Sequence, residues 1–446
     1  MPMPMTDPAP GDLSDLRFWA RPLAERDAAF RDLRSRPGLT RYALPKVPFL
    51  RRSPGYWAVV RHADIVEISR RPEVFSSEPS ATSPTDMPAW MGRYFTSMID
   101  MDDPRHAKIR RVVARAFSPR MLAKTEDDIA RRATRIVDEL IARGPCDFVA
   151  NAAVRLPVEV ICDMLGIPAR HHRRVVALTN IIVGYTDPEY VGTAVAYDRD
   201  TLTMSRAGTV RMLGTVARAG WELHRLAARI GRRRRDHPTG DLTSALVNAD
   251  IDGERLSPRE FAAFFLLLVV AGNETTRTAL AHGLKLLTDH PDQRALLLAD
   301  FDRRIGGAVE EIVRISTPVI FMRRNVTRDH ELGGHRFRKG DKVMLFYGSG
   351  NRDETVFPDP DRFDITRSPN PHLGFGGPGP HFCLGANLAR REITVMFREL
   401  FTRIPDITVG EPDRLLSGFI NGYKRLPCTF TPPRAARTPA PLESGR

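Results

Sequence analysis

Residues 375–385 read Phe-Gly-Gly-Pro-Gly-Pro-His-Phe-Cys-Leu-Gly, a glycine-rich turn that brings Cys383 to the start of a helix. Glycine permits backbone angles and close approaches that other residues resist. A cysteine at a helix N-terminus has its thiolate favoured by the helix dipole and by free N–H groups. Gly385 leaves room beside the sulfur for a flat macrocycle. We therefore predict that Cys383 is a thiolate metal ligand, because a turn that only buries a cysteine needs neither Phe375 nor His381.

The other three cysteines carry no such surroundings. Cys146, Cys162 and Cys428 lie far apart, and no CxxC pair occurs in the chain. This pattern argues against a disulfide framework and against a zinc cluster. We interpret these three residues as small buried hydrophobic side chains.

The bulk composition is that of a globular protein large enough to enclose a cofactor. The chain has 446 residues, of which 42% are hydrophobic and 27% are charged. Its N-terminus lacks the basic start and apolar run of a signal peptide. The most apolar run, 261–271, is too short to cross a bilayer. We expect no membrane span and a cytoplasmic location.

The net charge of +13 leaves open an anionic partner such as nucleic acid, a membrane or an acidic protein. The densest basic run is Arg232 to Arg235, which we interpret as a solvated helix end. The remaining basic residues are scattered, and no nucleic-acid-binding motif accompanies them. Charge alone therefore gives no reason to expect nucleic-acid binding.

Hydrophobic periodicity predicts a mainly α protein with small β-sheets. Helical spacing dominates 104–230, a helix starts at Ser257-Pro258 and runs to about 288, and another covers about 307–315. Strands and a hairpin are expected within 319–342, and a helix within 384–403. Residues 76–103 read as a long functional loop. Residues 1–15 and 432–446 are expected to be disordered tails that flank a single domain over 16–431.

The cysteine turn resembles the haem-binding signature of the cytochromes P-450. The resemblance implies that Cys383 is the proximal ligand of haem b (iron protoporphyrin IX), with Phe375 and Gly385 against the haem. It also implies the cytochrome P-450 fold, a triangular helical prism with the haem between a central helix and the cysteine-loop helix. A thiolate ligand pushes electron density toward the iron and so favours O–O cleavage.

A second motif, Ala271-Gly272-Asn273-Glu274-Thr275-Thr276, lies within an apolar helix. A buried acid beside a hydroxyl is costly unless it is used or satisfied. Thr275 can donate to a carbonyl one turn earlier, and Gly272 allows a local opening of the helix. The run resembles the family's oxygen-activation motif, which implies that Thr275 positions dioxygen and that Glu274 helps to relay protons. By the same resemblance Ala271 and Gly272 lie against the haem.

A third motif, Glu311-Ile312-Val313-Arg314, places an acid and a base on one helix face. Alone, this spacing is weak, since an exposed ion pair contributes only about 0–1 kcal/mol. In the family such a pair is buried and is joined by an arginine from a Pro-x-Arg-Phe segment, which here is Pro360 to Phe363. The resemblance therefore implies a structural triad of Glu311, Arg314 and Arg362.

Four basic residues match the family's haem-propionate positions. His106 and Arg110 are four apart and share a helix face. Arg324 follows the Glu-Arg helix, with Arg323 as its adjacent rival, and His381 precedes the cysteine by two positions. Carboxylates prefer such donors, arginine above all.

The predicted substrate pocket is apolar, and an apolar lining selects apolar substrates. Its candidates are Phe95, Met98, Leu267, Val270, Val319, Ile320, Phe419 and Ile420. The runs 271–277 and 385–392 are similar to those of mycobacterial members that oxidise methyl-branched fatty acids, isoprenoids and sterol side chains. We expect terminal (ω) hydroxylation of such a chain. The alternative within the same fold is hydroxylation of a secondary metabolite, a polyketide or a terpenoid.

Electrons must come from outside the chain, which has no flavin or iron–sulfur motif. We expect a ferredoxin and a ferredoxin reductase as partners, with NAD(P)H used indirectly and O2 as co-substrate. Arg111, Arg120, Arg390 and Arg391 are candidate contacts for an acidic ferredoxin. Two competing hypotheses, a peroxide-using enzyme and a non-enzymatic haem- or lipid-binding protein, are disfavoured by the intact Glu274-Thr275 pair.

Overall fold

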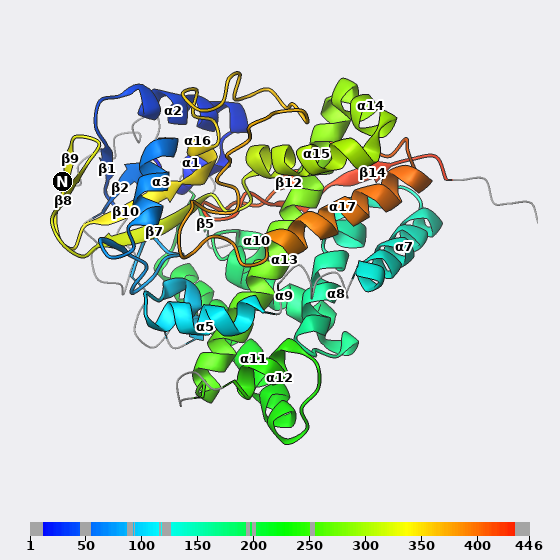
Figure 1. Ribbon diagram of the computed structural model, residues 1–446, viewed down its shortest axis with the longest axis horizontal. Coiled ribbons are helices and arrows are strands. Elements are labelled where there is room, and N and C mark those ends of the chain that lie inside the picture. Colours follow the sequence, from blue (N-terminus) through cyan, green and yellow to red (C-terminus); the bar gives the residue numbers. More distant parts are fainter. Residues whose placement is uncertain are drawn as a thin grey trace, which may run out of the picture.

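The computed structural model describes residues 12–44, 55–86, 92, 94–115, 117, 126–192, 197–198, 202–249 and 255–432. Its helices are as follows: α1 Leu16–Ala20, α2 Leu23–Ser35, α3 His62–Arg70, η1 Met98–Asp100, α5 Arg105–Ala114, α7 Glu126–Arg143, η2 Val149–Ala153, α8 Arg155–Met164, η3 Ala169–His171, α9 His172–Val183, α10 Pro188–Val191, α11 Arg206–Asp236, α12 Leu242–Val247, α13 Pro258–Asp289, α14 Pro291–Ala299, α15 Phe301–Ser316, α16 Tyr347–Gly350 and α17 Ala386–Arg403. The helices dominate one side of the molecule and the strands lie toward the other (Figure 1).

The strands are short and form small sheets. They are β1 Thr40–Tyr42, β2 Tyr56–Val59, β3 Phe75–Ser76, β4 Cys146–Asp147, β5 Tyr197–Asp198, β6 Thr203–Met204, β7 Phe321–Val326, β8 His330–Leu332, β9 His335–Phe337, β10 Lys342–Phe346, β11 Thr408–Val409, β12 Asp413–Arg414, β13 Tyr423–Arg425 and β14 Pro427–Thr429. The largest sheet has the order β1-β2-β10-β7-β3, and β8 and β9 form the predicted hairpin. The mainly α architecture with small sheets is confirmed.

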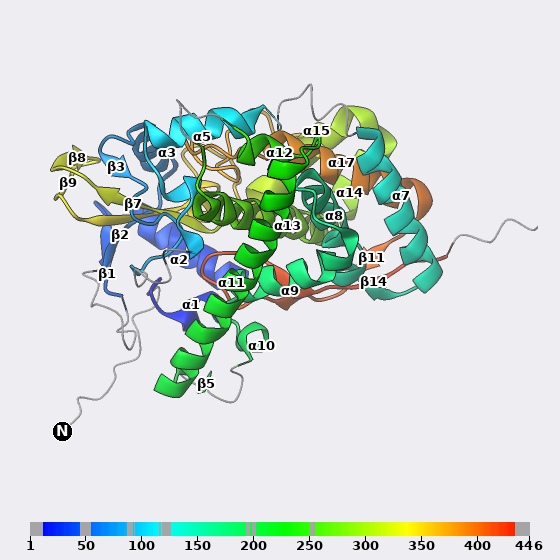
Figure 2. The same cartoon turned by 90° about the horizontal axis from the view of Figure 1, so that it is seen from below.

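Helix α13 forms the axis of the helical side and begins where the sequence predicts. The Ser257 hydroxyl accepts from the Glu260 backbone N–H while the Glu260 carboxylate accepts from the Ser257 N–H, and Pro258 occupies the first turn. This reciprocal cap satisfies two backbone donors at the helix start. The helix then packs against α8, α11, α15 and α17, so that most of its length is core. Figures 1 and 2 show it threading through the molecule between these helices.

Strand β7 carries side chains to two sides of the sheet, because successive residues of a strand point in opposite directions. It pairs antiparallel with β10, with Arg324 opposite Val343 and Met322 opposite Leu345. Met322 and Arg324 therefore share a face, and Arg323 belongs to the other. This alternation decides between the two adjacent arginines at the site below.

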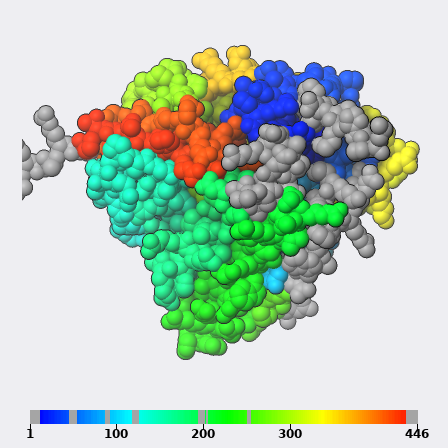
Figure 3. All heavy atoms as spheres, turned by 180° about the vertical axis from the view of Figure 1, so that it is seen from behind, coloured from blue at the N-terminus to red at the C-terminus, as the bar shows by residue number. Residues whose placement is uncertain are grey.

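The C-terminal segment returns across the molecule to the helical side. Strand β14 pairs with both β11 and β4, and β12 pairs with β13. On the face seen in Figure 3, this orange-red segment lies directly above the teal and green segments that contain α9, α10 and α11. The Thr186 hydroxyl, between α9 and α10, donates to the Leu416 carbonyl at 2.7 Å. This bond ties the C-terminal segment to the turn between α9 and α10.

Two predicted boundaries need correction. The N-terminal tail was expected to reach residue 15, but the packed chain already includes Leu13. This residue is buried, and its carbonyl accepts from the Trp19 indole at 3.0 Å. The loop expected over 76–103 begins at the last residue of strand β3 and contains the single turn η1, in which the Asp100 carboxylate accepts from the Ser97 N–H. The predicted tail residues 1–11 and 433–446, and 87–91 within the loop, lie outside the described residues. No helix of the described part is long and apolar enough to span a membrane.

Candidate active site

The glycine-rich turn before α17 presents Cys383 to an internal cavity. Gly376 has a φ of +88°, a left-handed conformation that favours glycine. A Cβ on Gly379 would clash with the backbone carbonyl of Ser69 in α3, so the turn needs a glycine to lie against that helix. The Cys383 N–H donates to the Phe375 carbonyl at 2.9 Å, which closes the turn. Cys383 lines this cavity.

Cys383 precedes helix α17 and is not its first residue, because the helix starts at Ala386 with Gly385 as its N-cap. Burial raises the pKa of the Cys383 thiol, while the Gly385 N–H, Arg110 and Arg390 oppose the rise. These three groups favour the thiolate, and a bound metal ion would complete the deprotonation.

The cavity lies between α13, β7 and the cysteine turn. Its volume is about 220 Å³, and its lining is mostly apolar. Ten residues were predicted to lie against the haem or at the distal site, and Glu274 and His106 do not line the cavity. The other eight do: Arg110, Ala271, Gly272, Thr275, Arg324, Phe375, His381 and Gly385. A Cβ on Gly385 would enter open space, so the glycine leaves the cavity free beside the sulfur.

Four basic side chains gather at one end of the cavity. The His106 and His381 rings are in contact, with centroids 4.3 Å apart and planes tilted by 38°, and the Arg110 guanidinium donates to the Phe382 carbonyl at 2.6 Å. Arg324 is buried and donates to the Arg323 carbonyl at 2.7 Å. Burial, followed by the charges of Arg324, His106 and Arg110, lowers the pKa of His381 to about 2. Positively charged groups therefore outnumber carboxylates in this cluster, in which Asp103 contacts only His106.

The geometry favours Arg324 over Arg323. Arg323 points out of the cavity, where it binds the Asp86 carboxylate at 2.7 Å and the Asn325 side chain at 2.6 Å. Among the described residues, neither Arg110 nor Arg324 has a carboxylate within ion-pair distance, and the buried Nε2 of His106 has no partner. A haem fits this end, because its two propionates would supply the missing acceptors while Cys383 supplies the sulfur ligand.

The distal motif divides between the two sides of α13. Thr275 faces the cavity, and its hydroxyl donates to the Ala271 carbonyl at 2.8 Å, the back-bond that the sequence predicts. Glu274 is fully buried on the side facing α9, where its carboxylate lies 2.5 Å from the Arg277 guanidinium. Burial raises the pKa of Glu274, and Arg277 offsets part of that rise. The predicted proton-relay acid therefore does not line the cavity.

A second acid, which the sequence analysis missed, does line it. Glu392 of α17 is buried at the cavity wall, and burial raises its pKa to about 8 while a hydrogen bond from the Thr276 side chain opposes the rise. It follows Cys383 by nine positions in helix α17. Its charge predicts an exposed side chain, so no local sequence pattern predicted that it is buried. Met322 was also missed, although it stands two residues before Arg324 on β7 and so shares its face.

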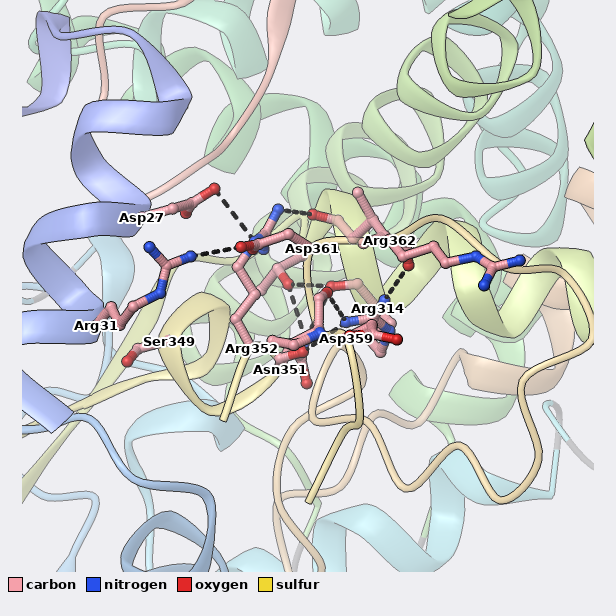
Figure 4. Close-up of polar contacts among 12 residues, drawn as sticks. Asp27, Arg31, Arg314, Ser349, Asn351, Arg352, Asp359, Asp361 and Arg362 are labelled. Atoms are coloured by element: carbon pink, nitrogen blue, oxygen red, sulfur yellow. Dashed lines mark hydrogen bonds and ion pairs between the residues drawn. The ribbon is translucent and has the colours of Figure 1, made fainter. Parts of the chain in front are cut away.

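The Glu311–Arg314 pair is buried and bidentate, as predicted, with both N–O distances at 2.8 Å. The third arginine is a correction. Arg362 is exposed, and only its backbone carbonyl takes part, accepting from Arg314 at 3.1 Å. Figure 4 shows the Arg362 side chain extending away from Arg314 while its carbonyl faces the guanidinium. The side chain that completes the triad is that of Arg367, whose Nε lies 3.3 Å from the Glu311 carboxylate.

This network holds together the segment that leads to the cysteine turn. Arg314 also donates to the carbonyls of Asn351 and Pro360, and Glu311 accepts from the Asp364 N–H and the Asn370 amide. The segment from Asn351 to Cys383 has no regular helix or strand, so its backbone groups depend on these side chains for partners. The Glu311–Arg314 pair thus acts structurally, by hydrogen bonding to the irregular segment before the cysteine turn.

The predicted substrate pocket is only partly correct. Met98, Leu267 and Val319 line the cavity. Val270, Phe419 and Ile420 instead pack together beside it, and Ile320 belongs to the core near β10. Phe95 contacts the 220 position of α11, away from the cavity. Apolar residues that the sequence analysis missed complete the wall, namely Ile99, Ile161, Leu268 and Met322.

The candidate ferredoxin contacts are also divided. The Arg390 guanidinium lies over the Phe375 ring, 4.4 Å from its centroid, and binds Glu310 at 2.5 Å. Its charge is therefore largely neutralised within the protein. Arg391 lies 2.5 Å from Glu126. Arg111 is exposed, as is Phe382 beside the cysteine, and Arg120 lies outside the described residues.

Comparison with known proteins agrees with this geometry. The sequence profile described as Cytochrome P450 matches residues 223–403. A "Methyl-branched lipid omega-hydroxylase" of Mycobacterium tuberculosis is 45% identical over 434 residues, which cover 96% of this chain and 97% of the relative. A "Steroid C26-monooxygenase" of Mycolicibacterium smegmatis is 39% identical over 383 residues, 84% of each chain.

Among solved structures, a cytochrome P450 of Mycobacterium marinum in complex with pseudoionone superposes with a TM-score of 0.87 at 44% identity, covering 94% of this chain and 98% of that one. These likenesses extend over nearly the whole sequence and include the cysteine turn and the distal motif. Haem b, O2 and NAD(P)H-derived electrons delivered by redox partners belong to the reaction of this family. The chain therefore belongs to the cytochrome P-450 family, and it is a haem-thiolate monooxygenase.

Proposed function

We propose that this protein hydroxylates the terminal methyl region of a methyl-branched lipid, within one catalytic domain spanning 16–431. The observation that carries the proposal is the apolar wall formed by Met98, Leu267, Leu268 and Val319 beside the cysteine turn. Such a wall offers a hydrocarbon chain burial and offers few polar groups to orient a polar substrate. The relatives named as a methyl-branched lipid hydroxylase and a steroid C26-monooxygenase support this substrate class.

Each group at the cavity has a separate task in this proposal. Cys383 would hold the haem iron, and Arg110, Arg324, His106 and His381 would hold its propionates. The haem supplies the iron that binds and activates O2. The apolar wall excludes water and orients the chain so that its end lies toward the iron.

Proton delivery rests on the two sides of α13. The Thr275 hydroxyl holds a proton at the cavity surface and is fixed by its bond to Ala271. Glu274 holds its carboxyl on the α9 side against Arg277, so it reaches the Thr275 side only by rotating away from that guanidinium. We expect Thr275→Ala to keep substrate binding but to lower the product formed per NADPH consumed. Glu274→Gln is expected to slow turnover and to increase its solvent isotope effect.

Electrons are proposed to come from a ferredoxin that is reduced by a ferredoxin reductase, in the cytoplasm where NAD(P)H is available. Its docking face would include Arg111 and Phe382, which are both exposed. Phe382 precedes Cys383, and its carbonyl accepts a hydrogen bond from Arg110, the neighbour of Arg111. Charge steering predicts that reduction slows as salt rises. Arg111→Glu should slow reduction strongly, whereas Arg338→Glu on the distant β8–β9 hairpin should not.

The substrate proposal is tested with the holoenzyme, NADPH, ferredoxin and reductase. Phytanic acid is compared with linear hexadecanoic acid by titration of the haem absorption band and by mass spectrometry under isotopically labelled O2. We expect tighter binding of the branched acid and a labelled hydroxyl at its terminal carbon. Insertion at an internal carbon, or binding of the linear acid alone, would overturn the proposal.

A further inference from the structure

Helix α11 presents an arginine-rich face to solvent that the monooxygenase reaction does not use. Its exposed arginines recur at helical spacing over almost the whole helix, at Arg206, Arg211, Arg218, Arg225, Arg229, Arg232 and Arg233. At 1.5 Å per residue this face is about 40 Å long. The opposite face is buried against α13 and α9. Within the run Arg232 to Arg235, Arg232 and Arg233 therefore end a continuous basic surface, whereas Arg234 turns inward and pairs with Asp241.

Neighbouring segments extend the charge and do not neutralise it. Arg170, Arg173 and Arg174 of η3 and α9 are exposed on the same side, and Arg229 lies close enough to His171 to lower its pKa, an effect second to that of burial and of Arg170. Glu222 within this face is shared by Arg174 and Arg218, and Asp236 is exposed at its C-terminal end. Arg206, Arg211, Arg229, Arg232 and Arg233 have no ion pair with any carboxylate of the described residues.

Two apolar side chains stand exposed within this basic face. Val210 is 55% exposed and Trp221 is 44% exposed, the two largest values among the exposed large hydrophobic residues of the described chain. The Arg225 guanidinium lies 4.7 Å from the centroid of the Trp221 ring. A tryptophan flanked by arginines on one long helix face is typical of a surface that rests at the boundary between lipid headgroups and acyl chains.

Figures 1 and 2 place α11 at the outside of the molecule, where it crosses the whole face seen from below. It also contacts the segment before the cavity, since the Tyr94 carbonyl bonds to the His224 ring at 2.8 Å and Gly220 lies against Phe95. Helix α11 thus contacts, through Gly220 and His224, the loop that precedes Met98 of the cavity wall. A lipid surface could supply the apolar substrate that this cavity with its apolar lining would bind.

We propose that the arginine face of α11 docks the enzyme on an anionic lipid surface, with Trp221 inserted at the headgroup level. Charge complementarity and the exposed tryptophan and valine favour a lipid surface over nucleic acid, because a phosphate backbone offers no apolar site for either side chain. The face is straight and long, which suits a plane of anionic headgroups. This docking does not depend on which lipid the enzyme oxidises.

The test uses the holoenzyme and vesicle flotation. Vesicles of phosphatidylcholine alone are compared with vesicles that contain about one third phosphatidylglycerol. We expect binding only to the anionic vesicles and release at high salt. The triple variant Arg225→Glu, Arg229→Glu, Arg232→Glu should lose at least about 100-fold in affinity, because each arginine near an anionic surface contributes roughly fivefold and each added carboxylate is repelled.

A matched control separates this face from net charge. The triple variant Arg328→Glu, Arg338→Glu, Lys339→Glu changes the charge equally, on and beside the β8–β9 hairpin, and should bind as the parent does. Brominated lipids should quench tryptophan fluorescence in the parent but not in Trp221→Phe. The reduced carbon monoxide spectrum confirms that each variant holds its haem.

Three results would overturn the proposal. The first is an absence of binding to anionic vesicles at low salt, and the second is an equal loss of binding in both triple variants. The third is tighter binding to a DNA duplex than to vesicles, with loss only in the α11 triple variant, which would assign the face to nucleic acid.

Discussion

Replacing Arg367 is expected to destabilise the protein, whereas replacing Arg362 is not. The Arg367 side chain is 9% exposed, and its guanidinium contacts the Glu311 carboxylate and donates to the carbonyls of Pro358, Asp359 and Arg362 at 2.8 to 3.2 Å. Truncation to alanine removes these donors and leaves Glu311 with one arginine. Arg362→Ala removes an exposed side chain and keeps the carbonyl that Arg314 uses.

The magnitude follows from the partners that are left. Water can reach the three carbonyls in part, and Arg314 still neutralises Glu311, so the full cost of breaking a buried pair does not apply. We expect Arg367→Ala to lower the free energy of unfolding by about 2–3 kcal/mol. Arg362→Ala should stay within about 0.5 kcal/mol of the parent. For a chain of this length the entropy of unfolding is about 0.9 kcal/mol/K, so the first change corresponds to a fall in Tm of about 3 °C.

The assay is thermal unfolding of the holoenzyme, followed both by circular dichroism and by the haem absorption band. Arg367→Lys serves as a second variant, since a lysine keeps the charge but cannot supply the same fork of donors. It should recover only part of the loss. If Arg362→Ala lowers Tm as much as Arg367→Ala does, the assignment of Arg367 to the network is wrong.

Three further predictions concern the cavity. Burial raises the pKa of Glu392 from 4.5 to about 8, so the folded state keeps a proton that the unfolded state releases. The stability that this group contributes is complete below pH 4.5 and is lost as pH rises toward 8, with a slope of at most about 1.4 kcal/mol per pH unit; denaturation of Glu392→Gln across this range should show a flatter profile. Arg324→Leu should speed haem loss to apomyoglobin at least about tenfold, while Arg323→Leu lowers Tm with little change in haem loss; equal rates would contradict the face assignment. Val319→Trp should fill the apolar wall and weaken binding of a branched fatty acid without abolishing the carbon monoxide spectrum, and unchanged binding would remove Val319 from the substrate site.

The parts of the site that sequence could predict are those fixed within a few residues. The cysteine turn, the cap of α13 and the back-bond of Thr275 each depend on neighbours along the chain. The choice of Arg324 also follows locally once β7 is known, because strand alternation separates it from Arg323. Ile320 shows where that rule stops: the strand begins at Phe321, so the residue before it does not continue the alternation.

The errors share a different cause. Adjacent helical residues differ by about 100° in direction, and here Thr275 faces the cavity while Glu274 faces Thr179 of α9. Val270 is four residues before Glu274 and lies on the same side of α13, which explains why both were wrongly placed at the cavity. Arg367 could not be found from sequence, because nothing local distinguishes its position from that of Arg362. Which arginine turns inward is decided by the path of an irregular segment, and that path depends on contacts with α15.

The Glu311 network also lowers the entropic cost of bringing Cys383 to its place in the fold. From Arg314 to Cys383 the chain makes an excursion of about seventy residues. Once Arg367 and Asn370 are tied to Glu311, the free span to the sulfur falls to under twenty residues, or about two halvings. Each halving of a loop lowers its closure cost by about 0.6 kcal/mol. Two halvings therefore lower the cost of closing the chain between this network and the cysteine turn by about 1.2 kcal/mol, so residues that do not line the cavity tether the one that does.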